Sequence, residues 1–168
     1  GLFLCSRHPE VKAIVTWSPA VALADPAAEL LNGPWGVQLA RLVRGSHHND
    51  YPFKQSVMHR YWTNHQCWEG VVQFSLFVKN AMTPATFAAI KCPVFVGYYY
   101  ENEEKQDPLV SVAAMQAMMP RLGTPPEQRQ IVNFPNSHDH VIGSRILSSD
   151  WQGVQAKSIA FLKDIAKI

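Results

Sequence analysis

The sequence lacks the features that define several protein classes. It has three cysteines, Cys5, Cys67 and Cys92, an odd number without the close pairs of a zinc ribbon or the density of a disulfide framework. No apolar run approaches the ~18 residues that a membrane-spanning helix requires, and the first residues lack the basic-then-apolar pattern of a signal peptide. The sequence therefore predicts three buried free thiols and no membrane span.

An excess of charge of one sign is also lacking. The 15 lysines and arginines are nearly balanced by 13 aspartates and glutamates, the formal net charge is +2, and like charges do not form runs. Binding to nucleic acid or to an anionic membrane surface would require a basic patch, so we expect neither partner. The basic cluster Arg41, Arg44, His47 and His48 is typical of a solvated helix end.

The sequence does contain an alternation of helical and strand patterns. Its 168 residues, 47% of them hydrophobic, suffice for one ordinary core. Apolar runs predict strands over residues 11–17, 94–100 and 130–134, and helical spacing predicts helices over residues 2–8, 111–122 and 150–165. This order predicts an α/β fold with a parallel sheet and right-handed crossovers.

Residues 21–90 interrupt the alternation. Asp25-Pro26 is a helix-start signal, and the region as a whole has no clear strand pattern. The region is rich in aromatic side chains, namely Trp35, Tyr51, Phe53, Tyr61, Trp62, Trp68, Phe74 and Phe77. The pattern predicts a helical insertion between the first and second strands of the sheet.

Two loops that follow predicted strands carry groups suited to acid–base chemistry. Asp107 lies in an acidic turn after the second strand, and Ser137-His138-Asp139-His140 follows the third. A carboxylate and an imidazole are two of the three groups of a serine–histidine–aspartate triad. In that triad the imidazole takes the proton of the serine and the carboxylate orients the imidazole. His138 and His140 compete for the role of base, and spacing alone does not decide between them.

Ordinary structural roles compete with this interpretation. An aspartate next to Pro108 is also what a simple turn requires, so Asp107 has that alternative. Ser6, Ser18 and Ser111 lie in or next to predicted helices and strands, but none has the flanking glycines that expose a nucleophilic hydroxyl on a strained turn. We therefore expect these three serines to be structural.

Three segments, in this order, resemble the C-terminal half of an α/β-hydrolase. Residues 7–20 (RHPEVKAIVTWSPA) resemble the helix after the nucleophile and the strand that follows it. Residues 92–97 (CPVFVG) with 107–112 (DPLVSV) resemble the strand and loop of the acid, and residues 134–142 (FPNSHDHVI) resemble the histidine loop. The resemblance implies a hydrolase core, residues 1–20 and 91–168, with a helical cap or lid at residues 21–90.

The same resemblance implies the chemistry. Asp107 corresponds to the orienting acid, and His140 to the base, because His140 directly precedes the apolar pair that follows the family's histidine. Gly1 matches the last glycine of the G-x-S-x-G elbow, so the serine and the oxyanion amides would belong to a missing N-terminal half, without which the chain is inactive. The implied substrate is a small-molecule carboxylic ester or related acyl compound, and no cofactor or metal is implied.

Two other functions are open on the sequence. His138, Asp139 and His140, together with His47 and His48, could contribute to the site of a metal-dependent hydrolase, although the H-E-x-x-H motif is absent. The other alternative is a non-catalytic fragment or module that binds an apolar ligand under its aromatic insertion.

Overall fold

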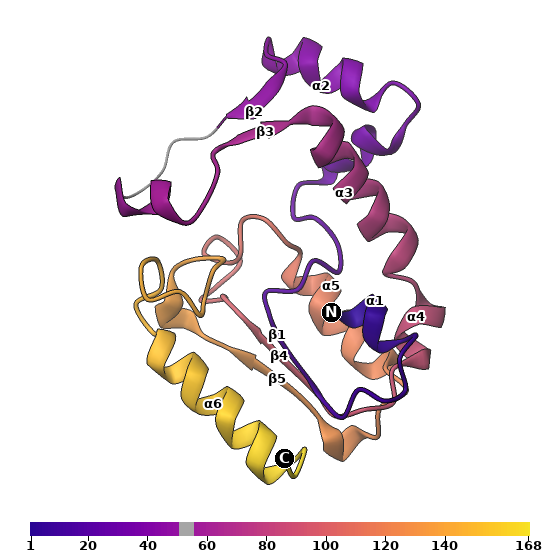
Figure 1. The fold of residues 1–168 in the computed structure, drawn as a ribbon, viewed down its shortest axis with the longest axis vertical. Helices are drawn as coiled ribbons and strands as arrows, with labels where there is room; N and C mark the ends of the chain where they lie inside the picture. Colours follow the sequence, from indigo (N-terminus) through magenta and orange to yellow (C-terminus); the bar gives the residue numbers. More distant parts are fainter. Residues whose placement is uncertain (51–55) are drawn as a thin grey trace. The chain divides into compact units, whose positions relative to one another are not determined.

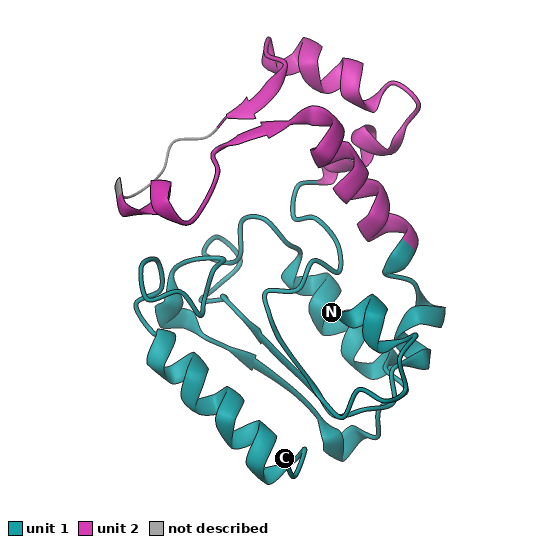
Figure 2. Cartoon of the chain, in the orientation of Figure 1, with its two compact units in different colours: residues 1–25, 81–168 teal, residues 26–80 magenta. Residues whose placement is uncertain are grey.

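The computed structural model describes residues 1–50 and 56–168. The chain divides into two compact units, unit 1 with residues 1–25 and 81–168 and unit 2 with residues 26–80 (Figure 2). Unit 2 begins and ends inside the predicted insertion, residues 21–90. Residues 21–25 belong to unit 1 because Ala24 donates its N–H to Leu109 O, and residues 81–90 because Phe87 and Ile90 enter the core of unit 1. Two aromatic residues of the insertion, Tyr51 and Phe53, lie outside the described residues.

Unit 1 is built on a parallel sheet with the strand order β1-β4-β5 (Figure 1). The strands are β1 (Ile14–Trp17), β4 (Val94–Tyr98) and β5 (Arg129–Asn133). The helices that flank this sheet are α1 (Leu2–Cys5), α4 (Pro84–Ala89), α5 (Val112–Met118) and α6 (Trp151–Asp164). The predicted α/β fold is confirmed, with each strand within a few residues of its predicted position.

The central strand β4 is buried on both faces. Val94 and Val96 pack in one core with residues of α1, α4 and α5, whereas Phe95 packs in a second core with Phe161 of α6. Figure 1 accordingly shows α6 on one side of the sheet and α1, α4 and α5 on the other. Burial on both faces explains why β4 appears in the sequence as a continuous apolar run and not as an alternating one.

Helix α5 illustrates how the sequence sets the helix ends. Ser111 Oγ accepts the N–H of Ala114 at 3.1 Å and so satisfies one unpaired donor of the first turn. Met115 and Met118 fill the core, as their helical spacing predicts. The predicted helix over residues 111–122 ends early: the chain continues as a 3₁₀ helix (Met119–Arg121), because Pro120 has no N–H to donate. In residues 1–50 and 56–168 no helix has the length and apolar character needed to cross a membrane.

Unit 2 contains helices and one short pair of strands. Its elements are a 3₁₀ helix (Pro26–Asn32), α2 (Gly36–Arg44), β2 (His48–Asp50), a 3₁₀ helix (Ser56–Arg60), β3 (His65–Cys67) and most of α3 (Trp68–Ala81). The antiparallel pairing of β2 with β3 contradicts the expectation that this region has no strand. The expectation was wrong because two strands of three largely polar residues leave no apolar alternation to detect.

The three cysteines are free thiols, but they are not equally buried. Cys5 in α1 is buried, and Cys92, ahead of β4, is half-buried. Cys67, the last residue of β3, is exposed, so the prediction of a buried thiol is wrong there. Trp68, the apolar residue next to Cys67, is buried, whereas all of β3 is exposed. An apolar neighbour in the sequence therefore does not imply a buried thiol here.

Candidate active site

Asp107 is held in a tight turn after β4. Its backbone N–H donates to Tyr99 O at 3.1 Å, which ties the turn to the end of the strand. Its Oδ1 accepts two backbone N–H bonds, from Leu109 at 3.0 Å and from Val110 at 3.1 Å. An aspartate that bonds the backbone two and three residues further on is the usual stabiliser of such turns. The Asp107 side chain is 0% exposed, so its position is fixed by the turn and by packing.

His140 lies in the loop that follows β5. The loop begins with a 3₁₀ helix (Pro135–Ser137), whose buried Ser137 Oγ donates to Phe134 O at 2.8 Å. His138 then adopts a left-handed backbone with φ 54°, which ends the helix and turns the chain. Beyond His140 the loop is anchored, because Val141 donates its N–H to Asp139 Oδ1 at 2.9 Å and Ile142 is fully buried.

These two loops bring Asp107 and His140 into contact. His140 Nδ1 lies 2.8 Å from Asp107 Oδ2 and 3.0 Å from Oδ1. The contact follows from the sheet: β4 and β5 are parallel neighbours, so the loops at their carboxyl ends emerge at the same edge. The His140 side chain is 27% exposed, so the pair has a buried acid and an imidazole that solvent still reaches.

The environment of Asp107 favours its ionised form. Burial by itself would raise the pKa of this carboxyl group. The hydrogen bond and charge of His140, with the N–H groups of Leu109 and Val110, outweigh burial and leave the pKa of Asp107 below its ordinary value. Asp107 is therefore an anion at neutral pH although water does not reach it.

An ionised carboxylate defines the proton position on the histidine. A carboxylate can only accept hydrogen bonds, so Nδ1 of His140 must carry the proton that is shared with Asp107. In the neutral ring Nε2 is then the unprotonated nitrogen. A ring in that neutral form has its free lone pair on Nε2, which is the arrangement that a general base requires.

The structure does not bring His138, the competing base, to a carboxylate in this way. His138 is exposed, and its ring lies edge-on to the ring of Tyr99 with the centroids 6.1 Å apart. Of the two histidines that the sequence left in competition, His140 is the one in contact with Asp107.

The three serines considered in the sequence occupy different environments. Ser6 Oγ donates to Phe3 O at 2.7 Å, and Ser111 Oγ caps α5. Ser18, directly after β1, has a backbone φ of 45°, and its buried Oγ has no hydrogen-bond partner among the described residues. The sequence does not predict this backbone conformation of Ser18, because no residue pattern marks a serine with positive φ.

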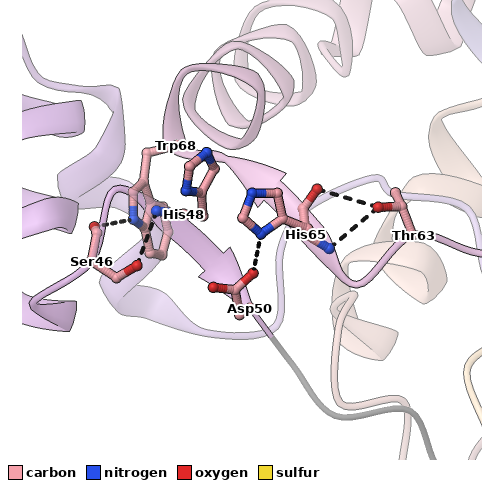
Figure 3. Close-up of polar contacts among 6 residues, drawn as sticks. All are labelled: Ser46, His48, Asp50, Thr63, His65 and Trp68. Carbon is pink, nitrogen blue, oxygen red and sulfur yellow. Dashed lines mark hydrogen bonds and ion pairs between the residues drawn. The ribbon is translucent and has the colours of Figure 1, made fainter.

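A second carboxylate–imidazole pair lies in unit 2 (Figure 3). Asp50 and His65 are opposite each other in the β2–β3 register, and His65 Nδ1 lies 2.6 Å from Asp50 Oδ1. The His48 ring lies against the His65 ring, with centroids 3.8 Å apart. Both partners of the Asp50–His65 pair are more than half exposed, so solvent screens their interaction. We interpret the cluster as a cross-strand contact of the hairpin.

The structure gives no support to a metal site. Within residues 1–50 and 56–168, no group of three His, Cys, Asp or Glu side chains is arranged to hold a metal ion.

Several solved hydrolases are similar in structure to this chain. A metagenome-derived lipolytic enzyme has a TM-score of 0.65 at 15% identity, covering 96% of this chain and 59% of its own. An enol-lactonase from Burkholderia xenovorans LB400 has a TM-score of 0.56 at 16% identity, covering 98% and 61%. A monoacylglycerol lipase from Paleococcus ferrophilus has a TM-score of 0.58 at 14% identity, covering 96% and 63%. No protein-family profile and no curated sequence matches the chain.

The similarity lies in the fold, since the identities are 14–16%. Nearly the whole chain is covered, whereas the chain spans about three fifths of the length of these hydrolases. The parallel order β1-β4-β5, with helices on both faces, matches the part of that fold to which the sequence motifs pointed. The chain has the fold of the C-terminal half of an α/β-hydrolase.

Proposed function

We propose that this chain is the acid–base part of a serine hydrolase that cleaves carboxylic esters or related acyl bonds through an acyl-enzyme. The observation that carries the proposal is the contact between His140 Nδ1 and the buried carboxylate of Asp107, 2.8 Å long, at the carboxyl edge of the sheet. A fold shared with lipolytic enzymes and a lactonase supports the choice of substrate class.

Each residue has a defined role in this reaction. His140 Nε2 takes the proton of a serine hydroxyl as the serine oxygen attacks the acyl carbon, and it then gives that proton to the leaving alcohol. A water molecule repeats the cycle on the acyl-enzyme and releases the acid. Asp107 holds the imidazole with Nδ1 protonated and stabilises the imidazolium that forms. The two N–H donors from Leu109 and Val110 support this role, because they keep Asp107 an anion.

The nucleophile, in our proposal, belongs to polypeptide that is not among these 168 residues. Ser6 and Ser111 use their hydroxyls within helices, and Ser18 is buried without the glycines of an elbow turn. Strand β1 is an edge strand, hydrogen-bonded in the described sheet to β4 alone. An additional parallel strand on that edge would deliver the serine and the oxyanion amides, which makes the N-terminal half of the hydrolase the required partner.

Unit 2 corresponds to the cap in this proposal and selects the acyl chain. It carries several large apolar side chains that are at least half exposed within the described residues, namely Leu30, Trp35, Leu42, Val43, Tyr61 and Phe77. Exposed apolar side chains in such number favour contact with an apolar ligand over a purely solvated surface. Small-molecule sites are lined mainly by apolar and aromatic side chains, so in our proposal these side chains contact the acyl chain and select its length.

The test compares two polypeptides. One is these 168 residues alone, and the other is the same residues preceded by the polypeptide that is encoded immediately upstream of Gly1. Each is treated with a fluorophosphonate, which labels an activated serine, and assayed for hydrolysis of p-nitrophenyl esters. We expect the longer polypeptide to be labelled and active, and the 168-residue chain to be neither.

The labelled residue decides between outcomes. An adduct on a serine upstream of Gly1, lost in the longer polypeptide when His140→Ala is introduced, supports the proposal. Stoichiometric labelling of the 168-residue chain alone would contradict the assignment of the nucleophile. A folded longer polypeptide with no labelling and no esterase activity would contradict the hydrolase itself.

A further inference from the structure

Two cysteines from distant parts of the sequence meet inside unit 1. Cys5 is the last residue of α1 and is 7% exposed, and Cys92 is a half-buried residue ahead of β4. Their Sγ atoms are 3.0 Å apart although 87 positions separate them in the sequence. The pair lies apart from the candidate active site, because Cys92 precedes β4 whereas Asp107 follows it, at the opposite end of the strand.

A cavity gives small molecules access to this pair. It measures about 90 Å³ and is lined by both cysteines together with His8 and Lys91, among others. On the same measure a single water molecule needs only about 10–15 Å³. The cavity therefore has room for a molecule as small as hydrogen peroxide next to both cysteines.

We propose that Cys5 and Cys92 form an oxidisable dithiol, which a small hydroperoxide converts into an intramolecular disulfide between α1 and the segment entering β4. A disulfide bond is about 2.05 Å long, so the two sulfurs need to approach by about 1 Å from their present separation of 3.0 Å. The inference rests on the geometry of unit 1 and is independent of the proposed hydrolase activity.

The reaction balances with hydroperoxide as the only oxidant. The sulfur of Cys92 attacks one peroxide oxygen, the O–O bond breaks, and a sulfenic acid and one water (or alcohol) form. Cys5 then attacks the sulfur of Cys92, the S–O bond breaks, and the hydroxyl leaves as a second water with the proton of Cys5. Both thiols are oxidised by one electron each, and the peroxide is reduced by two.

The order of the two steps follows from the different environments of the thiols. Burial, and then the contact with Cys92, raise the pKa of Cys5 to about 12, so Cys5 is a thiol at neutral pH. Cys92 is also the more exposed of the two, so Cys92 meets the oxidant first and Cys5 is the resolving thiol.

The test treats the dilute, purified 168-residue chain with a slight excess of hydrogen peroxide, alkylates the remaining thiols, and maps the peptides by mass spectrometry. We expect a Cys5–Cys92 disulfide and an alkylated Cys67. Cys67→Ser is the matched control: its side chain is exposed, so this variant should form the same disulfide at the same rate. A reference sample in guanidinium chloride should favour Cys67–Cys92, the pair with the shortest loop.

Comparison with the denatured sample distinguishes a disulfide that the fold specifies from one that forms at random. Native pairing of Cys5 with Cys92, against the preference of the unfolded chain, supports the proposal. It is overturned if the native protein gives the same pairing as the denatured sample, gives only intermolecular disulfides, or keeps both thiols alkylatable. In Cys5→Ala the sulfenic acid should persist and be trapped on Cys92 by a cyclic 1,3-diketone, and a Cys92 that stays a free thiol there would contradict the assigned order.

Discussion

At the scale of single residues, the proposed chemistry depends on Asp107. Its carboxylate is ionised although water does not reach it. Transferring such a group from water costs several kcal/mol. Asp107 offsets this with two backbone N–H donors and the imidazole of His140. Hydrogen bonds to a charged group contribute about 1.5–3 kcal/mol each, so all three of them favour the anion. Removing the charge should therefore be felt in stability as well as in catalysis.

The stability of unit 1 should depend on the ionisation of Asp107. Its pKa in the folded chain lies below the ordinary 3.8, so the anion stabilises the fold above pH 3.8, and this contribution is lost as pH falls through the folded pKa. Asp107→Asn should lower the free energy of unfolding by about 2 kcal/mol at pH 7. The difference from the parent should shrink below pH 3.8, as measured by urea unfolding from pH 7 to pH 2.5.

A matched substitution separates this effect from a general loss of charge. Asp164 is an exposed residue at the end of α6. Asp164→Asn should change the free energy of unfolding by no more than about 0.5 kcal/mol across the same pH range. A difference between the parent and Asp107→Asn that stays constant down to pH 2.5 would mean that the carboxylate charge is not what stabilises the turn.

At the scale of elements, packing distinguishes residues that the sequence pattern treats alike. Helix α6 has Ile159 and Phe161 among its apolar residues. Phe161 is 1% exposed and packs its ring against Phe95 at 5.5 Å between centroids, whereas Ile159 is 43% exposed. The two residues are neighbours in sequence but belong to opposite sides of the helix.

Substitution on these two sides of α6 should have unequal cost. Phe161→Ala should lower the free energy of unfolding by about 3–5 kcal/mol, because it leaves a cavity between α6 and the sheet. Ile159→Ala, on the same helix, should cost less than about 1 kcal/mol, since little apolar area is lost from the core. Equal losses in chemical denaturation would mean that α6 does not pack on β4 as described.

Two tryptophans of unit 2 also differ in their burial. Trp68 is 5% exposed and donates its indole N–H to Ser46 O at 3.0 Å, whereas Trp35 is 70% exposed. In the longer polypeptide that supplies the proposed nucleophile, Trp68→Ala should reduce thermal stability and leave the ratio of rates on short and long acyl esters unchanged. Trp35→Ala should preserve stability and shift that ratio. The reverse assignment of the two effects would contradict a role of the exposed apolar side chains in chain-length selection.

How far the sequence predicts these elements depends on how each one is buried. Strand β4 is buried on both faces and appears as an uninterrupted apolar run, so its position and its two-sided cover are predictable. Strands β2 and β3 are short and polar, so no alternation of apolar and polar residues predicts them. Which of His138 and His140 contacts Asp107 is not predictable from spacing alone, because the left-handed turn at His138 has no signal in the sequence.

At the scale of the whole molecule, the edge strand β1 is the feature that ties fold to function. In the part of the chain that the structure describes, β1 pairs with β4 alone, and Trp17 at its end is 46% exposed. An apolar parallel strand with an unpaired edge is a template for association with another strand. The same edge is where the proposed N-terminal half would add its strand, so self-association of the isolated chain and inactivity would have one cause.

The most direct measurement of the central claim, that His140 is the base held by Asp107, compares His140→Ala with His138→Ala in the longer polypeptide that supplies the nucleophile. The two histidines share a loop, so each variant controls for the other. We predict that His140→Ala lowers kcat on a p-nitrophenyl ester by at least about 10³-fold, while His138→Ala retains kcat within about threefold. A crippled His138→Ala beside a nearly normal His140→Ala would contradict the account.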